Sequence, residues 1–212
     1  MTSKDSSVQT APRTRLSAEQ RGAQITAAAR QIALANGLDA VTLRAVAAEA
    51  GVAPALVAHY VPSMDALVAE TFTAIVIDEL GELKAITDRA PDARSALLAL
   101  LDTLLDGSRD EVTLVWVQGW GLGGRTESLA IAVREAMDAW EAYLEAIVAG
   151  GIATGELRVD DPRGAALLLL GMIDGLNAHA LVRWRDAPQR RALLAVALEA
   201  MLGMPKGSLA AQ

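Results

Sequence analysis

The fold is decided by residues 43–61, LRAVAAEAGVAPALVAHYV, where Gly51 and Pro54 interrupt two short segments with helical apolar spacing. Gly commonly follows a helix C-terminus, and Pro is tolerated in a first helical turn. Counted from the start of the stretch, the small Ala47 stands fifth, Gly51 ninth and the β-branched Val57 fifteenth. A small residue at a helix crossing, a glycine turn and an apolar residue packing back predict a helix-turn-helix. An ordinary helical corner could satisfy the same three constraints.

The rest of the chain also has helical patterns. Ala and Leu dominate the composition, and no segment shows sustained strand alternation. SAEQ at residues 17–20 is a capping box, and Gly and Pro mark later breaks. We expect an all-α chain with helices near 17–36, 43–50, 54–60, 63–87, 92–106, 110–122, 126–149, 162–184 and 188–203. The expected units are a disordered arm (1–16), a helix-turn-helix DNA-binding domain (17–62), a larger helical ligand-binding and dimerisation domain (63–204) and a flexible tail (205–212).

The composition limits the class of protein. The 212 residues include no cysteine, which excludes disulfides and thiolate metal sites and favours a reducing cytoplasm. We find no signal-peptide pattern, and the most apolar stretch, residues 165–173, is too short to span a bilayer. The sequence therefore predicts a soluble cytoplasmic protein without membrane association, and no motif requires a metal ion or a cofactor.

Charge is unevenly distributed along the chain. Residues 1–60 carry six basic and four acidic groups, a net charge of +2, while the remaining residues have a net charge of −9. A weakly basic DNA-binding module on an acidic body would have this asymmetry, although many unrelated proteins share it. Arg13 and Arg15 could reach a minor groove or phosphates as a flexible arm.

The second helix of the motif would enter a major groove of DNA. On its outward face His59 is the only side chain able to hydrogen-bond a base or phosphate, while Ala55 could contact a thymine methyl group. Arg44 is the best candidate for reading guanine. The hydroxyls of Thr42 and Tyr60 suit phosphate contacts, which fix the register without reading sequence.

The segment TLRAVAAEAGVAPALVAHYVPSMDAL (residues 42–67), preceded by AAARQIALANGLDAV (27–41), closely resembles the N-terminal domain of TetR-family transcriptional regulators. The resemblance implies a homodimer, most often a repressor, that binds a palindromic operator and is released when its C-terminal domain binds a small molecule. Carried over position by position, it implies DNA contacts from Thr42, Arg44, Pro54, Ala55, His59 and Tyr60.

Three positions depart from the family pattern. Ala58 occupies the place of a frequent Tyr, and Val61 replaces the usual Phe. Met64 replaces a commonly basic residue that touches phosphate. Loss of one phosphate contact predicts weaker DNA binding, with a salt slope flatter by about one unit.

A looser resemblance links the chain to the BetI-type subgroup, some members of which respond to choline. It rests on HY at residues 59–60, VWVQGW at 115–120 and MIDGL at 172–176. We assign no ligand from it.

The helices near 162–184 and 188–203 carry much apolar surface, and Gly171 and Gly175 lie four residues apart on one face. Two such helices from each of two chains could form a four-helix dimer interface. The alternative is that both helices are core within one chain, and the family resemblance favours the dimer.

Aromatic residues gather in the helices that flank Gly123-Gly124. Aromatic stripes at helical spacing usually belong to a core, and a pocket wall with a few polar groups is the functional alternative. Aromatic rings beside an acidic group would suit a cationic ligand. The candidate ligand-binding residues are Trp116, Trp120, Trp140, Tyr143, Asp174, Asn177 and His179, with Gln118 as a further polar candidate.

Two other functions compete with this prediction. An enzyme is disfavoured because we find no catalytic residue set, nucleotide-binding loop or paired-His metal motif, and carboxylates such as Asp78 and Glu79 are expected to be solvated or ion-paired. The second competitor is a helical dimer that binds a ligand or protein but has lost operator binding. Effector, operator, regulated genes and the sign of regulation stay open.

Overall fold

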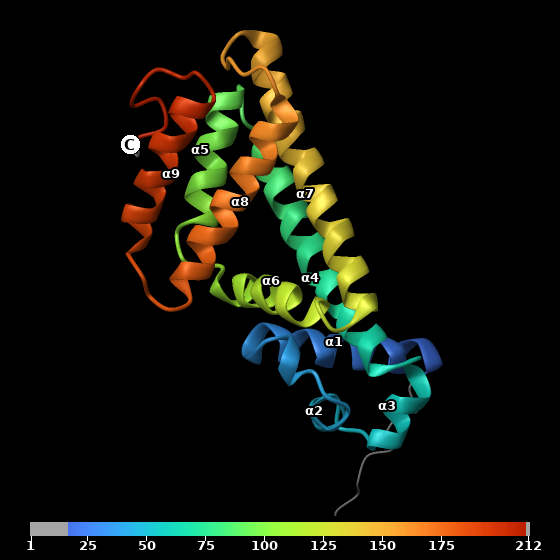
Figure 1. Cartoon of the computed structure of the whole chain (residues 1–212). Coiled ribbons are helices and arrows are strands. Elements are labelled where there is room, and N and C mark those ends of the chain that lie inside the picture. Colours follow the sequence, from blue (N-terminus) through green and yellow to red (C-terminus); the bar gives the residue numbers. More distant parts are fainter. Residues whose placement is uncertain (1–16, 211–212) are drawn as a thin grey trace, which may run out of the picture.

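The structure, a computed structural model, describes residues 17–210 and contains no β-strand in that range. The all-α prediction is confirmed (Figure 1). The helices are α1 (Ala18–Asn36), the 3-10 helix η1 (Leu38–Ala40), α2 (Leu43–Glu49), α3 (Pro54–Tyr60), α4 (Met64–Thr87), α5 (Ala93–Leu104), α6 (Asp110–Gly123), α7 (Glu127–Thr154), α8 (Pro162–Ala180) and α9 (Ala187–Met201).

The helices α1, η1, α2 and α3 form a small unit, called the head here. The Ser17 side chain accepts a hydrogen bond from the Gln20 backbone, and the Gln20 side chain returns one, so the expected capping box starts α1. Gly51 has φ +63, which allows the tight turn between α2 and α3 that a residue with a Cβ adopts only with strain. Val46, Ala47 and Val57 are buried at the crossing of the two helices.

The helix α4 joins the head to the larger unit, called the body here, which consists of α4 to α9 (Figure 1). Its first half, including Leu67 and Phe72, belongs to the apolar cluster of the head. Its second half, including Leu80 and Leu83, belongs to the apolar cluster of the body. Both cores therefore share this single continuous helix.

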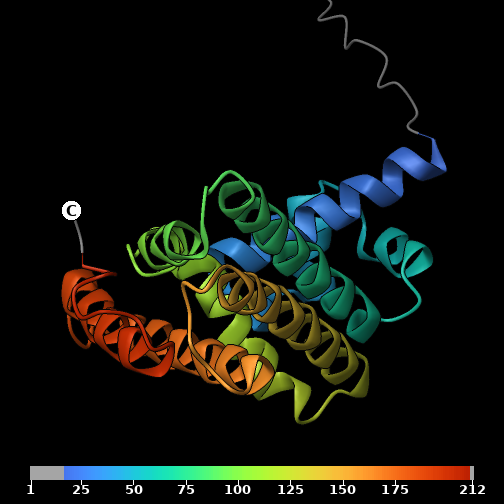
Figure 2. The ribbon, with the colours of Figure 1, turned by 90° about the horizontal axis from the view of Figure 1, so that it is seen from above.

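Within the body, α6 lies against the head, while α7 packs along α4 and α8 (Figure 1). The helices α8 and α9 line one side of the body (Figure 2). Within the described residues no single helix is long and apolar enough to cross a membrane, although α3 and α4, at 73° to each other, pass that test as a bent pair by length and composition.

Two helices, α7 and α8, end four or more residues from the expected positions. The helix α7 continues through Gly150 and Gly151 to Thr154, and Gly155 ends it in the left-handed conformation with φ +78. Gly151 is buried, and an added Cβ would lie 2.6 Å from Leu157. This glycine therefore permits close packing and does not break the helix. The helix α8 ends at Ala180, four residues before the expected end.

Residues 205–210 are expected to belong to a flexible tail, but in the structure they pack against the body. Leu209 is fully buried, and the Glu199 carboxylate accepts hydrogen bonds from the backbone N–H groups of Gly207 and Leu209 (both 2.8 Å). Arg94 donates to the Ser208 carbonyl oxygen (2.7 Å).

Gly119→Ala tests the packing of α6 on α4. An added Cβ would stand 2.7 Å from Phe72 Cε2 and 3.3 Å from Val133 Cγ2, both in the core. We expect a loss of about 1–3 kcal/mol in the free energy of unfolding, measured by urea denaturation. Gly121→Ala is the control, because the exposed Gly121 has nothing within 4 Å of its added Cβ and gains up to about 1 kcal/mol of helix propensity. Equal stability of the two variants would contradict the described contact.

Candidate DNA-binding surface and effector cavity

The head presents one face made by the start of α2 and the outer side of α3. Of the six residues expected at DNA, five are exposed and Tyr60 is half-buried; the exposed ones are Thr42, Arg44, Pro54, Ala55 and His59. Val57 is fully buried on the opposite side of α3, so the helix is anchored by its apolar side. The expected contacts of Arg13 and Arg15 lie outside the described residues.

The polar side chains on this face differ in which contacts they already make within the protein. The Thr42 hydroxyl accepts a hydrogen bond from the Ala45 backbone (3.2 Å) as the N-cap of α2, and its own hydrogen is left for a phosphate oxygen. The His59 and Tyr60 rings meet edge to face at 5.5 Å, which orients both at the end of α3. Arg44 is exposed on the first turn of α2.

The body contains a cavity lined by residues of the five helices α4 to α8, called the inner cavity here. It leaves about 30 Å³ accessible to water-sized molecules, room for only one or two waters. An organic ligand would therefore have to move its walls. Its lining consists of Glu79, Leu104, Thr113, Trp116, Trp120, Met137, Trp140, Leu170, Ile173, Asp174 and Asn177.

Five of the seven predicted ligand-binding residues line this cavity: Trp116, Trp120, Trp140, Asp174 and Asn177. The other two predicted ligand-binding residues, Tyr143 and His179, lie outside this cavity, contrary to the expectation. The Tyr143 hydroxyl forms a buried hydrogen bond with Thr87 (2.9 Å), and His179 is exposed and contacts the Trp184 ring at 5.1 Å.

Gln118, the further polar candidate, also points elsewhere. It faces the head, where its Oε1 accepts a hydrogen bond from the Asp39 backbone N–H (3.0 Å). An added Cβ on Gly37 would lie 2.5 Å from the same carboxamide group. The helix α6 therefore contacts the head through Gln118 and the cavity through Trp116 and Trp120.

The indole rings are held in defined positions. Trp116 and Trp120 lie 5.8 Å apart between ring centroids, and Phe72 meets Trp116 edge to face at 5.2 Å. Trp116 Nε1 donates to Glu79 Oε2 (3.0 Å). The Nε1 groups of Trp120 and Trp140 are buried without a hydrogen-bond partner among the described residues, an arrangement that costs free energy unless an acceptor is supplied.

Two acidic side chains face the same cavity. Burial raises the pKa of Glu79, which is 6% exposed, while the Trp116 hydrogen bond and the Arg109 charge act in the opposite direction. Burial, and after it the charge of Glu79, raises the pKa of Asp174 to about 7. The described residues contain no group of three or more His, Cys, Asp or Glu side chains placed to hold a metal ion.

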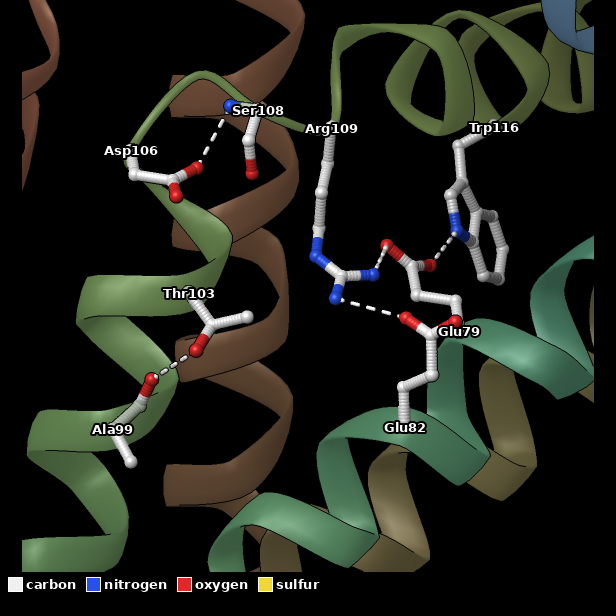
Figure 3. A network of polar contacts seen from close by, with 8 residues as sticks. All are labelled: Glu79, Glu82, Ala99, Thr103, Asp106, Ser108, Arg109 and Trp116. Carbon is white, nitrogen blue, oxygen red and sulfur yellow. Dashed lines mark hydrogen bonds and ion pairs between the residues drawn. The ribbon is translucent and has the colours of Figure 1, made fainter.

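Glu79 also lines a second hollow, called the outer recess here, of about 270 Å³. Figure 3 shows the Glu79 carboxylate between the Trp116 indole and the Arg109 guanidinium. Arg109 Nη1 is 4.0 Å from Glu79 Oε1, and Arg109 Nη2 is 3.0 Å from Glu82 Oε2. The recess is lined by Arg30, Leu34, Ile75, Glu79, Glu82, Ser108, Arg109, Glu111 and Val112.

A helix-turn-helix head on a helical body with an internal cavity defines a class of transcriptional regulators. Residues 25–71 match the bacterial regulatory proteins of the tetR family, and residues 91–203 match the C-terminal domain of BetI-type transcriptional repressors. Because the second match covers more than half of the chain, the chain belongs to the TetR family of transcriptional regulators. The BetI-type resemblance is confirmed as well. No curated protein sequence is similar enough to count as a relative.

Solved structures share the fold. A putative transcriptional regulator from Pseudomonas aeruginosa PAO1 is 25% identical, with a TM-score of 0.75 over 90% of this chain and 94% of its own. A putative regulator from Saccharomonospora viridis in complex with choline is 24% identical, with a TM-score of 0.74 over 84% and 94%. A putative TetR-family regulator from Rhodococcus sp. is 21% identical, with a TM-score of 0.73 over 86% and 98%.

Proposed function

We propose that this regulator is a homodimeric repressor that binds a palindromic operator and is released by a small organic cation. The observation that carries the proposal is the inner cavity, in which three indole rings and two carboxylates meet. Two of its wall helices, α4 and α6, also contact the head. Residues 17–62 would bind DNA, while residues 63–204 would bind the effector and form the dimer.

The proposed dimer interface is the outer face of α8 and α9 (Figure 2). Its large apolar side chains are more than half exposed, which is unusual for a folded monomer when they occur together on adjacent helices. Gly171 and Gly175 leave open space on α8, where a second helix could approach closely. The exposed side chains are Leu167, Leu168, Leu193 and Val196.

The proposed effector carries a positive charge, because indole faces and carboxylates attract a cation in a low-dielectric cavity. The unpaired Nε1 groups of Trp120 and Trp140 favour an effector that also has an acceptor oxygen. The choline bound to the regulator from Saccharomonospora viridis has both features and guides the choice of probe.

The proposed mechanism is a population shift. A ligand too large for the inner cavity would favour the setting of α4 and α6 in which the cavity is wider. Both helices contact the head, so the two heads of a dimer would change their separation. Recognition helices must lie about 34–36 Å apart to reach successive major grooves, and a shift of a few ångströms would weaken operator binding.

Fluorescence anisotropy tests the proposal. The protein is titrated against a duplex from its own upstream intergenic DNA and a scrambled duplex, each at two salt concentrations and with or without choline. We expect selective, salt-sensitive binding that choline weakens. Equal weak binding to both duplexes, followed by failure to enrich any site from genomic DNA, would instead support a helical module without operator binding.

Arg44→Ala tests direct base reading by the head. Arg44 is exposed at the start of α2, and a bidentate contact with guanine is worth about 1–3 kcal/mol. We expect that loss in operator affinity, together with relaxed preference at one base position of each half-site, measured by anisotropy with single-base operator variants. Arg89→Ala, at an exposed arginine after α4, is the control and should bind like the wild type. Unchanged base preference in Arg44→Ala would contradict the assigned role.

A further inference from the structure

The outer recess and the inner cavity meet at one side chain, Glu79, which lines both. One carboxylate oxygen accepts the Trp116 indole N–H at 3.0 Å. The other faces Arg109 Nη1 at 4.0 Å, a separation at the outer limit of an ion pair. Glu79 is therefore fixed on the cavity side and loosely neutralised on the recess side (Figure 3).

Arg109 has a second, closer partner. Its Nη2 lies 3.0 Å from Glu82, one turn further along α4 than Glu79. Arg109 can therefore give up Glu79 and keep an ionic partner at the more solvated position, since Glu82 is largely exposed while Glu79 is buried. When Arg109 releases Glu79, its guanidinium therefore still has Glu82 as a partner.

We propose that Arg109 is a built-in counter-ion of Glu79 that a cationic effector displaces, so that Arg109 sets the affinity of the cavity for cations. The inference rests on the proposed cationic effector. Two positive charges cannot both neutralise Glu79 closely without repelling each other in a poorly solvated site. An effector must therefore overcome the attraction of Glu79 for Arg109.

The position of Arg109 links this exchange to the head. Arg109 is the N-cap residue of α6, and its carbonyl oxygen accepts the first helical hydrogen bond, from Thr113 N–H at 2.9 Å. Nine residues later Gln118 holds the Asp39 backbone of the head. An effector that pushes Arg109 towards Glu82 acts on the start of the same helix that contacts the head.

The experiment measures the dissociation constant of tetramethylammonium by isothermal titration calorimetry for the full chain and three variants at pH 8.5. The Arg109 charge lowers the pKa of Glu79, and its removal at lower pH would let a proton occupy the place of the cation. We expect Arg109→Gln to bind tetramethylammonium about 3–10-fold more tightly than the wild type, because the competing charge is gone. Arg109→Lys keeps that charge and should bind like the wild type.

Arg30→Gln is the matched control. Arg30 lines the same outer recess, but its ion pair is with Asp78 at 2.8 Å and not with Glu79. Its affinity for tetramethylammonium should change less than about 2-fold, because its charge is screened by solvent and by Asp78. A similar gain in Arg30→Gln and Arg109→Gln would overturn the counter-ion role in favour of a general effect of charge.

Two further outcomes separate the inference from the proposed function. A wild type that binds tetramethylammonium while Arg109→Gln binds equally or more weakly would overturn the counter-ion role alone. A wild type and variants that all fail to bind tetramethylammonium and choline would overturn the cationic effector, and the counter-ion role with it. Thermal melts of each variant identify one that has simply failed to fold.

Discussion

Asp174→Asn is expected to stabilise the protein strongly at pH 8 and much less at pH 5. The pKa of Asp174 is 3.8 in an ordinary environment and about 7 in the folded cavity. Between these values the folded state holds a proton that the unfolded chain has lost, so the contribution of Asp174 to stability is present below about pH 4 and is lost as the pH rises through 7. Asn carries no charge in either state and avoids this loss.

The expected size follows from about 1.4 kcal/mol per pH unit. Between pH 5 and pH 8 the advantage of Asp174→Asn over the wild type should grow by about 2 kcal/mol, after allowance for the incomplete burial of Asp174. This corresponds to roughly 4–8 °C in the difference of midpoints measured by thermal denaturation. Asp138→Asn, on an exposed position of α7, should follow the wild type at both pH values. Parallel pH profiles of Asp174→Asn and the wild type would contradict the raised pKa.

The same substitution should weaken cation binding, so a stability gain and an affinity loss are coupled in one side chain. At pH 8 we expect Asp174→Asn to bind tetramethylammonium about tenfold more weakly, the equivalent of about 1.4 kcal/mol, because a counter-charge in the cavity is gone. The wild type should also lose affinity below pH 7, where a proton neutralises Asp174.

The head could be predicted from sequence because its determinants are local. The turn glycine, the small residue at the helix crossing and the apolar residue packing back all lie within residues 43–61. In the structure, Gly51 has the positive φ that such a turn requires, and Ala47 and Val57 are buried. The helix-turn-helix is therefore determined within this short stretch, and contacts with the rest of the chain do not alter it.

The inner cavity could be predicted only in part, because its lining comes from five helices, α4 to α8, at different places along the chain. The expectation of a solvated or ion-paired side chain fits Asp78, which is exposed and pairs with Arg30. Glu79 is buried and fits only the ion-paired alternative, with Arg109 as its partner. A sequence signal was present, since Glu79 follows Phe72 by seven residues and Ile75 by four and therefore lies on the apolar face of α4.

No comparable sequence signal shows which of the predicted ligand-binding residues reach the inner cavity. Trp140 and Tyr143 are three residues apart on α7 and both buried, yet only Trp140 reaches the cavity. The rotation of α7 against α4 decides which of the two does so, and the pairing of Tyr143 with Thr87 depends on that rotation. The spacing of residues along one helix cannot determine its rotation against another.

Leu168→Glu combined with Val196→Glu is expected to abolish dimerisation and, with it, nearly all operator binding. The two side chains are 61% and 62% exposed on α8 and α9, on the face proposed to pack against a second copy. Four carboxylates would enter each dimer interface, and a buried charge without a partner costs several kcal/mol. Light scattering should give the mass of a single 22.2 kDa chain for the double variant and twice that mass for the wild type.

Operator affinity should fall by about 100-fold or more, because a dimer binds its second half-site at the high effective concentration that the first contact creates. The α3 face is unchanged in the double variant, so the residual affinity should be that of one head for one half-site. Ile77→Glu is the matched control, since Ile77 is 60% exposed on α4 and outside the proposed interface, and it should remain dimeric with full operator affinity. A double variant that stays dimeric would place the interface on another face. One that becomes monomeric but binds the operator normally would show that the two heads act independently, and the release mechanism through head separation would then be wrong.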